Sequence, residues 1–99
     1  MSEDKILNKN QIEELYEALL KLKTKEDCKV FLDDLCTFKE VEQMAQRVSA
    51  AKLLIEGETY EKVIEKTKIS SATLSRVSKC VKYGEGYNKI LKEKSRRID

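Results

Sequence analysis

The segment Thr59–Val77, TYEKVIEKTKISSATLSRV, constrains the fold more than any other part of the chain. Thr59 is a good N-cap for a short helix whose Val63 faces inward. Ser70 can cap a second helix, because its hydroxyl can accept a hydrogen bond from a backbone N–H two or three residues later. Ser71 competes for that role. Since only a tight turn separates the two segments, the pattern predicts a helix-turn-helix.

The second helix of this pair has one apolar face and one polar face. Leu74, Val77 and Val81 recur at i, i+3 and i+7 and predict a buried stripe, with Ile69 filling the space between the two helices. The opposite face carries small, hydroxyl-bearing and cationic side chains, which suit base edges and phosphates in a DNA groove. It consists of Ala72, Ser75, Arg76 and Lys79, with Tyr83 at its end. An ordinary helical hairpin with a solvated basic face would give a similar pattern.

The net charge of +2 is unevenly distributed along the chain. Residues 1–67 carry 11 Lys or Arg and 15 Asp or Glu, whereas residues 68–99 carry 9 and 3. A basic C-terminal third joined to an acidic scaffold favours a protein that presents one surface to a polyanion. A pattern selected only for solubility would look the same.

Several classes of protein are disfavoured by composition. Cys28, Cys36 and Cys80 form no Cys-x-x-Cys pair and the chain has no histidine, so we expect no zinc site. The odd number of cysteines and the polar N-terminus favour reduced thiols in the cytoplasm. We expect no membrane association, because no apolar run approaches the length of a membrane span. No phosphate loop, nucleophile elbow or acid–base cluster is visible, so we expect neither an enzyme nor a bound cofactor.

The remaining chain carries start and stop signals of a series of helices, and the absence of proline favours an all-α fold. Asn8 or Asn10 can cap a first helix that runs to about Lys23. Thr24 then begins a second helix with a capping-box-like pattern, Thr-Lys-Glu-Asp.

The longest helix is predicted to begin at the capping box Thr37-Phe-Lys-Glu40 and to stop at Gly57 in the left-handed conformation. Its expected apolar stripe consists of Val41, Met44, Val48, Ala51 and Ile55. In the helix-turn-helix itself, Lys68 stands where glycine is common, and a positive φ there would cost about 1 kcal/mol.

We expect a single domain spanning residues 1–99. Its predicted parts are N-terminal dimerisation helices at 1–36, a long central helix at 37–58, the helix-turn-helix at 59–83, and a C-terminal helix with a basic tail at 84–99. The narrow, amphipathic first helices have little surface to bury against in so short a chain, which favours a homodimer. Two-fold symmetry would place two reader helices roughly 34 Å apart on a palindromic site. A compact six-helix monomer is the alternative.

The run from Thr37 to Lys82 resembles the Trp repressor superfamily, and most closely the Trp-repressor-like proteins of the YerC/YecD type. The shared motifs are Gln-Arg-Val at 46–48, Leu-Leu-Ile-Glu-Gly at 53–57, Ala-Thr-Leu-Ser-Arg at 72–76 and Lys-Tyr-Gly-Glu-Gly-Tyr at 82–87. The resemblance implies a six-helix, intertwined homodimer that regulates transcription in the bacterial cytoplasm by binding double-stranded DNA. The residues that it would bring to DNA are Ser70, Ser71, Ala72, Thr73 and Ser75.

The resemblance also implies a possible effector pocket between the reader helix and the long helix. The matching positions here are Thr37, Arg47, Arg76, Val77 and Cys80. The Trp repressor has glycine at the position of Val77 and serine at that of Cys80. A valine would occupy space that an indole needs, and a thiol is a poorer hydrogen-bond partner, so tryptophan is not expected as corepressor and any other effector is unknown.

Two arginines of this set have other interpretations. Arg47 is favoured as a surface residue that pairs with Glu40 or Glu42, or that covers the core with its aliphatic stem. Arg76 is a phosphate clamp, a base reader or a wall of the pocket, and phosphate contact is the commonest fate of such a residue.

The preferred hypothesis is therefore a homodimeric, sequence-specific regulator of transcription, with repression favoured, that reads a palindromic operator in the major groove. The alternative is a helical interaction module that binds an acidic protein partner.

Overall fold

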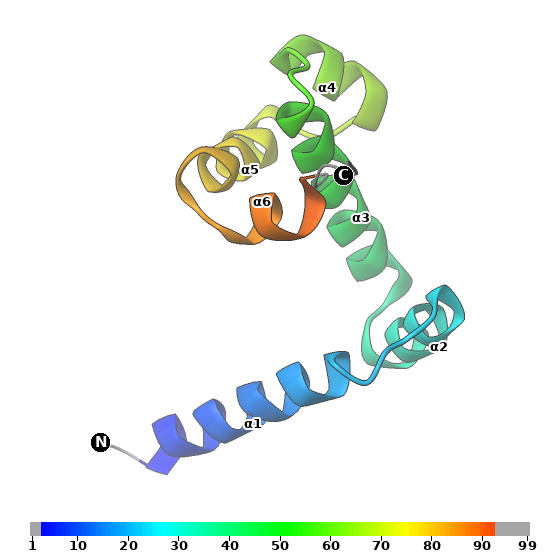
Figure 1. Cartoon of the computed structure of the whole chain (residues 1–99), viewed down its shortest axis with the longest axis vertical. Coiled ribbons are helices and arrows are strands. Elements are labelled where there is room, and N and C mark those ends of the chain that lie inside the picture. Colours follow the sequence, from blue (N-terminus) through cyan, green and yellow to red (C-terminus); the bar gives the residue numbers. More distant parts are fainter. Residues whose placement is uncertain (1–2, 93–99) are drawn as a thin grey trace, which may run out of the picture. The chain divides into compact units, whose positions relative to one another are not determined.

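The computed structural model describes residues 3–92, which form six α-helices and no strand (Figure 1). The helices are α1 (Glu3–Leu19), α2 (Lys25–Leu35), α3 (Phe38–Ile55), α4 (Tyr60–Thr67), α5 (Ser71–Tyr83) and α6 (Gly86–Leu91). The predicted all-α, six-helix fold is confirmed. Contacts within the chain group it into two units, residues 1–37 and residues 38–99.

In the first unit, the predicted bounds of the first helix were wrong. α1 begins at Glu3, so Asn8 and Asn10 lie inside it, and it ends at Leu19 rather than at Lys23. Asparagine costs only about 0.7 kcal/mol or less in a helix interior, so a possible capping residue does not by itself start a helix. After Leu19 the backbone tightens into i→i−3 hydrogen bonds, one of which joins Leu22 N to Leu19 O at 3.1 Å.

The start of α2 is the capping box that the sequence predicts. Thr24 Oγ1 accepts from Asp27 N at 2.9 Å, and Asp27 Oδ2 accepts from Thr24 N at 3.3 Å. The same carboxylate oxygen accepts from Lys23 N at 3.0 Å. These backbone donors, Lys23 first, favour the ionised form and hold the pKa of Asp27 below its ordinary value.

The first unit leaves one apolar face of α1 exposed. Ile12, Leu15, Tyr16 and Leu19 recur at i, i+3, i+4 and i+7 on α1, and all four are exposed. No side chain between residues 7 and 36 is buried within the structure. α1 therefore carries an apolar face that the first unit does not itself cover.

In the second unit, α3 packs against α4, α5 and α6, which gather around its C-terminal part (Figure 1). The fully buried core consists of Ala50, Ala51, Val63, Ile69, Leu74 and Val77. The core is small, and four of its six residues come from α4, α5 and the turn between them. The helix-turn-helix thus shares its core with the long helix.

The predicted stripe on the long helix was partly wrong. Val48 is 44% exposed, whereas Ala50, which the stripe omits, is fully buried together with Ala51. Two adjacent alanines let neighbouring helices approach α3 closely, because short side chains leave shallow grooves for the opposing ridges. The large apolar residue at Val48 lies outside that contact.

The ends of the helices around this core have local causes. Gly57 has φ 98°, which confirms the predicted left-handed stop after α3. Gly84 ends α5, and a Cβ at this position would lie 2.8 Å from Cys80 O, so glycine is needed there for space. Asn88 Nδ2 donates to Val81 O at 2.7 Å and ties α6 to the last turn of α5.

Among the described helices, none combines the length and the apolar character that crossing a bilayer requires.

Candidate nucleic-acid interface

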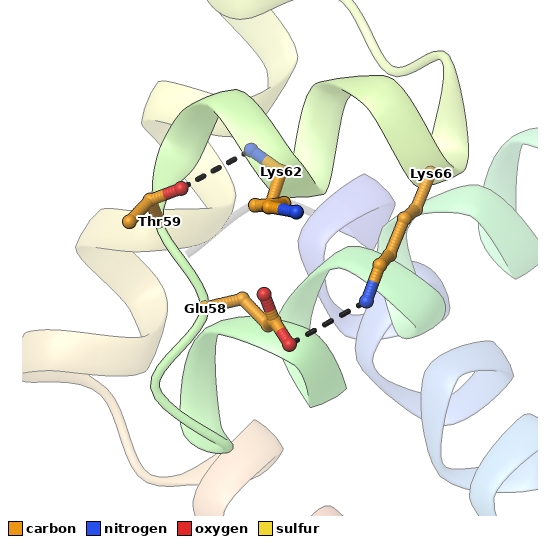
Figure 2. Close-up of polar contacts among 4 residues, drawn as sticks. All are labelled: Glu58, Thr59, Lys62 and Lys66. Atoms are coloured by element: carbon orange, nitrogen blue, oxygen red, sulfur yellow. Dashed lines mark hydrogen bonds and ion pairs between the residues drawn. The ribbon is translucent and has the colours of Figure 1, made fainter.

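The first helix of the helix-turn-helix, α4, is held by two polar contacts, one at its N-cap and one from its last turn. Thr59 Oγ1 accepts from Lys62 N at 3.2 Å, which confirms the predicted N-cap (Figure 2). Lys66 Nζ pairs with Glu58 Oε2 at 3.4 Å and links the last turn of α4 to the residue before the cap (Figure 2). Val63 points into the core and is fully buried, as predicted.

The turn between α4 and α5 is short and tightly bonded. Lys68 has φ 65° and ψ 19°, which is the left-handed conformation. Glycine is common at this position, and from the sequence we expected a positive φ to be costly for lysine. Its N–H donates to Ile64 O at 2.8 Å. Ile69 follows and is only 2% exposed, so it fills the space between the helices as predicted.

The second helix, α5, begins at a well-defined cap. Ser70 Oγ accepts from Thr73 N at 3.2 Å, so Ser70 is the N-cap and Ser71 is the first helical residue. Ser70 Oγ also donates to Thr73 Oγ1 at 3.0 Å. Of the two serines that the sequence offered, the structure uses Ser70.

The faces of α5 are those that the sequence predicts. Leu74 and Val77 are buried and Val81 is half-buried. Ser78 is also buried, although the predicted stripe omits it; its place four residues after Leu74 was the available signal. Of the predicted DNA-contacting residues, Thr73 is half-buried and the others are exposed, namely Ser70, Ser71, Ala72, Ser75, Arg76 and Lys79.

The exposed face of α5 is cationic as well as rich in hydroxyl groups. Arg76 and Lys79 take no part in the ion pairs that the chain forms at Lys29–Asp33 and Lys66–Glu58. No acidic residue lies in the first turn of α5. The helix therefore offers short polar side chains at its N-terminal end and positive charge one turn later, an arrangement suited to base edges flanked by phosphates.

Part of the predicted effector pocket comes together in the structure. Arg47 on α3 and Arg76 on α5 line one hollow of about 520 Å³ with Ala72 and Thr73. Val77 lies in the core beneath this surface and is 1% exposed. The other two positions do not line this hollow: Cys80 is half-buried further along α5, and Thr37 is the last residue of the first unit.

A second hollow of about 440 Å³ adjoins the first at Arg47 and Thr73. It is also lined by Gln43, Gln46, Lys68 and Ser70. Its lining is polar and cationic, and it lies between α3 and the N-terminal end of α5. Gln43 was not singled out from the sequence, and Gln46 and Lys68 were named there only for other reasons, because the hollow forms only when α3 packs beside the turn.

Between residues 7 and 92, no three His, Cys, Asp or Glu side chains converge as a metal site would require. Cys28, Cys36 and Cys80 are free and half-buried.

Comparison with known proteins identifies relatives of this architecture. The sequence profile of the family described as Trp repressor protein matches residues 10–95. The uncharacterized protein YerC of Bacillus subtilis (strain 168) is 44% identical over 84 residues, which cover 85% of this chain and 80% of that protein.

Two crystal structures have the same fold. A candidate Trp repressor from Staphylococcus aureus has a TM-score of 0.81 and 35% identity, covering 92% of both chains. A TrpR-like protein from Eubacterium eligens ATCC 27750 has a TM-score of 0.78 and 39% identity, covering 82% of this chain and 84% of that one.

Proposed function

The chain belongs to the Trp repressor family, and we propose that it is a homodimeric regulator of transcription that binds DNA. In this proposal each copy inserts α5 into the major groove of one half of a palindromic operator, and binding represses the gene. The protein acts in the bacterial cytoplasm, where reducing conditions keep its free cysteines as thiols. We assign it no enzymatic activity.

The observation that carries the proposal is the exposed face of α5. Ser71, Ala72 and Ser75 have short side chains, so the helix backbone can approach base edges closely. Arg76 and Lys79 follow on the same exposed surface, where a guanidinium can fork onto guanine or a phosphate. Ser70 and Thr73 are engaged with each other at the cap, which leaves the reading of bases mainly to the exposed residues.

The uncovered apolar face of α1 supports the homodimer. Ile12, Leu15, Tyr16 and Leu19 are exposed on one side of this helix, and a second copy would supply a surface to bury them. Two-fold symmetry would then place the two α5 helices about one turn of DNA apart, roughly 34 Å.

Any effector would bind beside this reader rather than inside the core. Arg47 and Arg76 face one hollow, and two guanidinium groups favour an anionic ligand. Val77 is packed into the core, so we propose that the side chain of tryptophan has no room next to it and that tryptophan is not the corepressor.

Selection of bound sequences from random DNA duplexes at one salt concentration tests the proposed function. We expect a palindromic consensus, bound by the dimer with an affinity that falls steeply with salt. Replacing Ser71 and Ser75 by alanine should abolish the sequence preference, because these hydroxyls reach the groove while the cap at Ser70 is untouched. If the double variant still prefers the selected duplex, the hydroxyls of Ser71 and Ser75 are not the groups that read the bases.

Lys79→Ala is the matched control for that experiment. The lysine is exposed on the same helix and its charge suits a phosphate, so its loss should weaken binding to every duplex and flatten the salt dependence by about one phosphate. A change in sequence preference in this variant would instead make Lys79 a base reader.

The exposed cationic face keeps one alternative open, a helical interaction module for an acidic protein. The same duplex selection separates the two functions. Binding that depends on salt but returns no consensus, together with tighter binding to an acidic polypeptide such as poly-glutamate, would favour the interaction module.

A further inference from the structure

A side chain of the long helix holds the end of α4. Gln46 Nε2 donates a hydrogen bond to Thr67 O at 3.0 Å, although the two residues are 21 positions apart in sequence. Thr67 is the last residue of α4, so its carbonyl is one of the terminal groups that a helix cannot satisfy internally. Gln46 therefore supplies from α3 the hydrogen-bond donor that α4 lacks.

Thr67 in turn organises the turn that leads to α5. Its hydroxyl donates to Val63 O at 2.7 Å and accepts from Ile69 N at 3.2 Å. The left-handed Lys68 lies between these bonded groups, and its own N–H is held by α4. The hydrogen bond from Gln46 thus acts on the backbone three residues before the cap at Ser70.

Gln46 lies where α3 meets both helices of the reader. It lines a hollow of about 630 Å³ together with Lys66 and Thr67 at the end of α4. It also lines the hollow of about 440 Å³ that reaches Ser70 and Thr73 at the start of α5. Both hollows are polar and accessible, so water can replace a lost hydrogen bond to the Thr67 carbonyl. We therefore expect the loss of the Gln46 hydrogen bond to change the geometry of the turn more than the free energy of unfolding.

We infer that Gln46 is a positioning residue for DNA reading, which sets the direction of α5 through the Thr67 carbonyl without contacting bases itself. The inference rests on the proposed function of α5 as the reader. α5 has 13 residues and is about 20 Å long, so a small rotation at the turn displaces the side chains along it. Hydrogen bonds to base edges tolerate little displacement, whereas contacts between flexible cations and phosphates tolerate more.

The test compares two glutamines of α3. Gln46→Met removes the donor and keeps the length of the side chain. Gln43→Met is the matched control, because Gln43 lies one turn earlier and lines the same two hollows, while the hydrogen bond to Thr67 comes from Gln46. The measurement is the ratio of affinities for the selected duplex and for a random duplex, over a series of salt concentrations.

We expect Gln46→Met to lower this ratio of affinities about tenfold, equivalent to about 1.4 kcal/mol. The salt dependence of the affinity for the selected duplex should keep its slope, because the phosphate contacts remain. Gln43→Met should leave both quantities as in the wild type. An unchanged ratio in Gln46→Met, or an equal loss in Gln43→Met, would overturn the inference. So would a salt slope reduced by about one in Gln46→Met, since Gln46 would then contact a phosphate directly.

Two further measurements keep the inference separate from folding and from the proposed function. Gln46→Asn keeps the amide but is one methylene shorter, and it replaces Gln46→Met if that variant fails to fold. It should lower the ratio of affinities for the selected and random duplexes in the same way. In the free protein, Gln46→Met should accelerate amide exchange at Ile69 and Thr73 but not at Ala51. Unchanged exchange would overturn the positioning role, whereas a wild-type protein without sequence preference would overturn the proposed function alone.

Discussion

Ser70 and Thr73 are joined by two hydrogen bonds at the start of α5, and the Ser70 hydroxyl takes part in both. It accepts from Thr73 N at 3.2 Å and donates to Thr73 Oγ1 at 3.0 Å. The neighbouring Ser71 hydroxyl is exposed and takes no part in this pair. The two adjacent serines therefore have different roles, Ser70 in holding the helix start and Ser71 in facing the solvent or a groove.

Replacing each serine by alanine should separate these roles. Ser70→Ala removes the N-cap and should lower the free energy of unfolding by about 1 kcal/mol. Ser71→Ala removes an exposed hydroxyl and should change it by less than about 0.5 kcal/mol. Urea denaturation of the two variants, followed by circular dichroism, measures both values. Equal losses would mean that the cap is shared between the serines.

Replacing the turn residue Lys68 by glycine should stabilise the fold. The φ of 65° at Lys68 places a Cβ-bearing residue in the left-handed region. Lys68→Gly removes that strain but adds backbone entropy to the unfolded chain, so we expect a net gain of about 0.5 kcal/mol in the free energy of unfolding.

Lys66→Gly provides the contrasting control for that prediction. Lys66 lies in the last turn of α4 and pairs with Glu58 (Figure 2). Glycine there should lower the free energy of unfolding, because it adds backbone entropy to the unfolded chain and removes the ion pair without relieving any strain. Urea denaturation should therefore give shifts of opposite sign, and a loss of stability in both variants would contradict the strained turn.

Acid should weaken the start of α2 through Asp27. The backbone N–H of Lys23 is the main cause that holds the pKa of Asp27 below its ordinary value, and the Thr24 side chain and backbone act in the same direction. Because the folded-state pKa is the lower one, the stabilisation is complete above the unfolded-state pKa and is lost as pH falls through the folded-state pKa. Thermal unfolding over an acidic pH series should show this loss.

Asp27→Asn tests whether this carboxylate causes the acid sensitivity. The variant should lose part of the pH dependence, because asparagine accepts hydrogen bonds without titrating. Asp34→Asn, on the exposed surface of the same helix, should keep the wild-type dependence. Identical pH profiles for Asp27→Asn and the wild type would assign the effect to other carboxylates.

Helix starts were predictable from the sequence where a cap decides them. Thr24, Thr59 and Ser70 each accept a hydrogen bond from the backbone N–H three residues later. Such a cap depends on only four consecutive residues, so the sequence alone can indicate it. The start of α1 was not predictable in this way, because Asn8 and Asn10 could equally cap a helix or lie inside one.

Features that depend on how helices meet were not accessible from periodicity. The spacing of apolar residues on α3 correctly indicated Ala51, but it also indicated the exposed Val48 and missed the buried Ala50. The hydrogen bond from Gln46 to the Thr67 carbonyl has the same origin, since nothing local to either residue signals its partner. For the site, the exposed face of α5 was predictable because one helix carries it, whereas the hollow beside Arg47 depends on two.

Val77 makes the response to tryptophan a sharp test. Its side chain is 1% exposed and belongs to the core, so the hollow at Arg47 and Arg76 does not extend into the helix beneath. A ligand at 100 times its Kd adds about 2.7 kcal/mol to stability, which raises the melting temperature measurably. We expect millimolar tryptophan to shift neither the melting temperature nor the affinity for the selected duplex, compared with glycine at the same concentration. A rise in both with tryptophan alone would show that the chain makes room for the indole despite Val77.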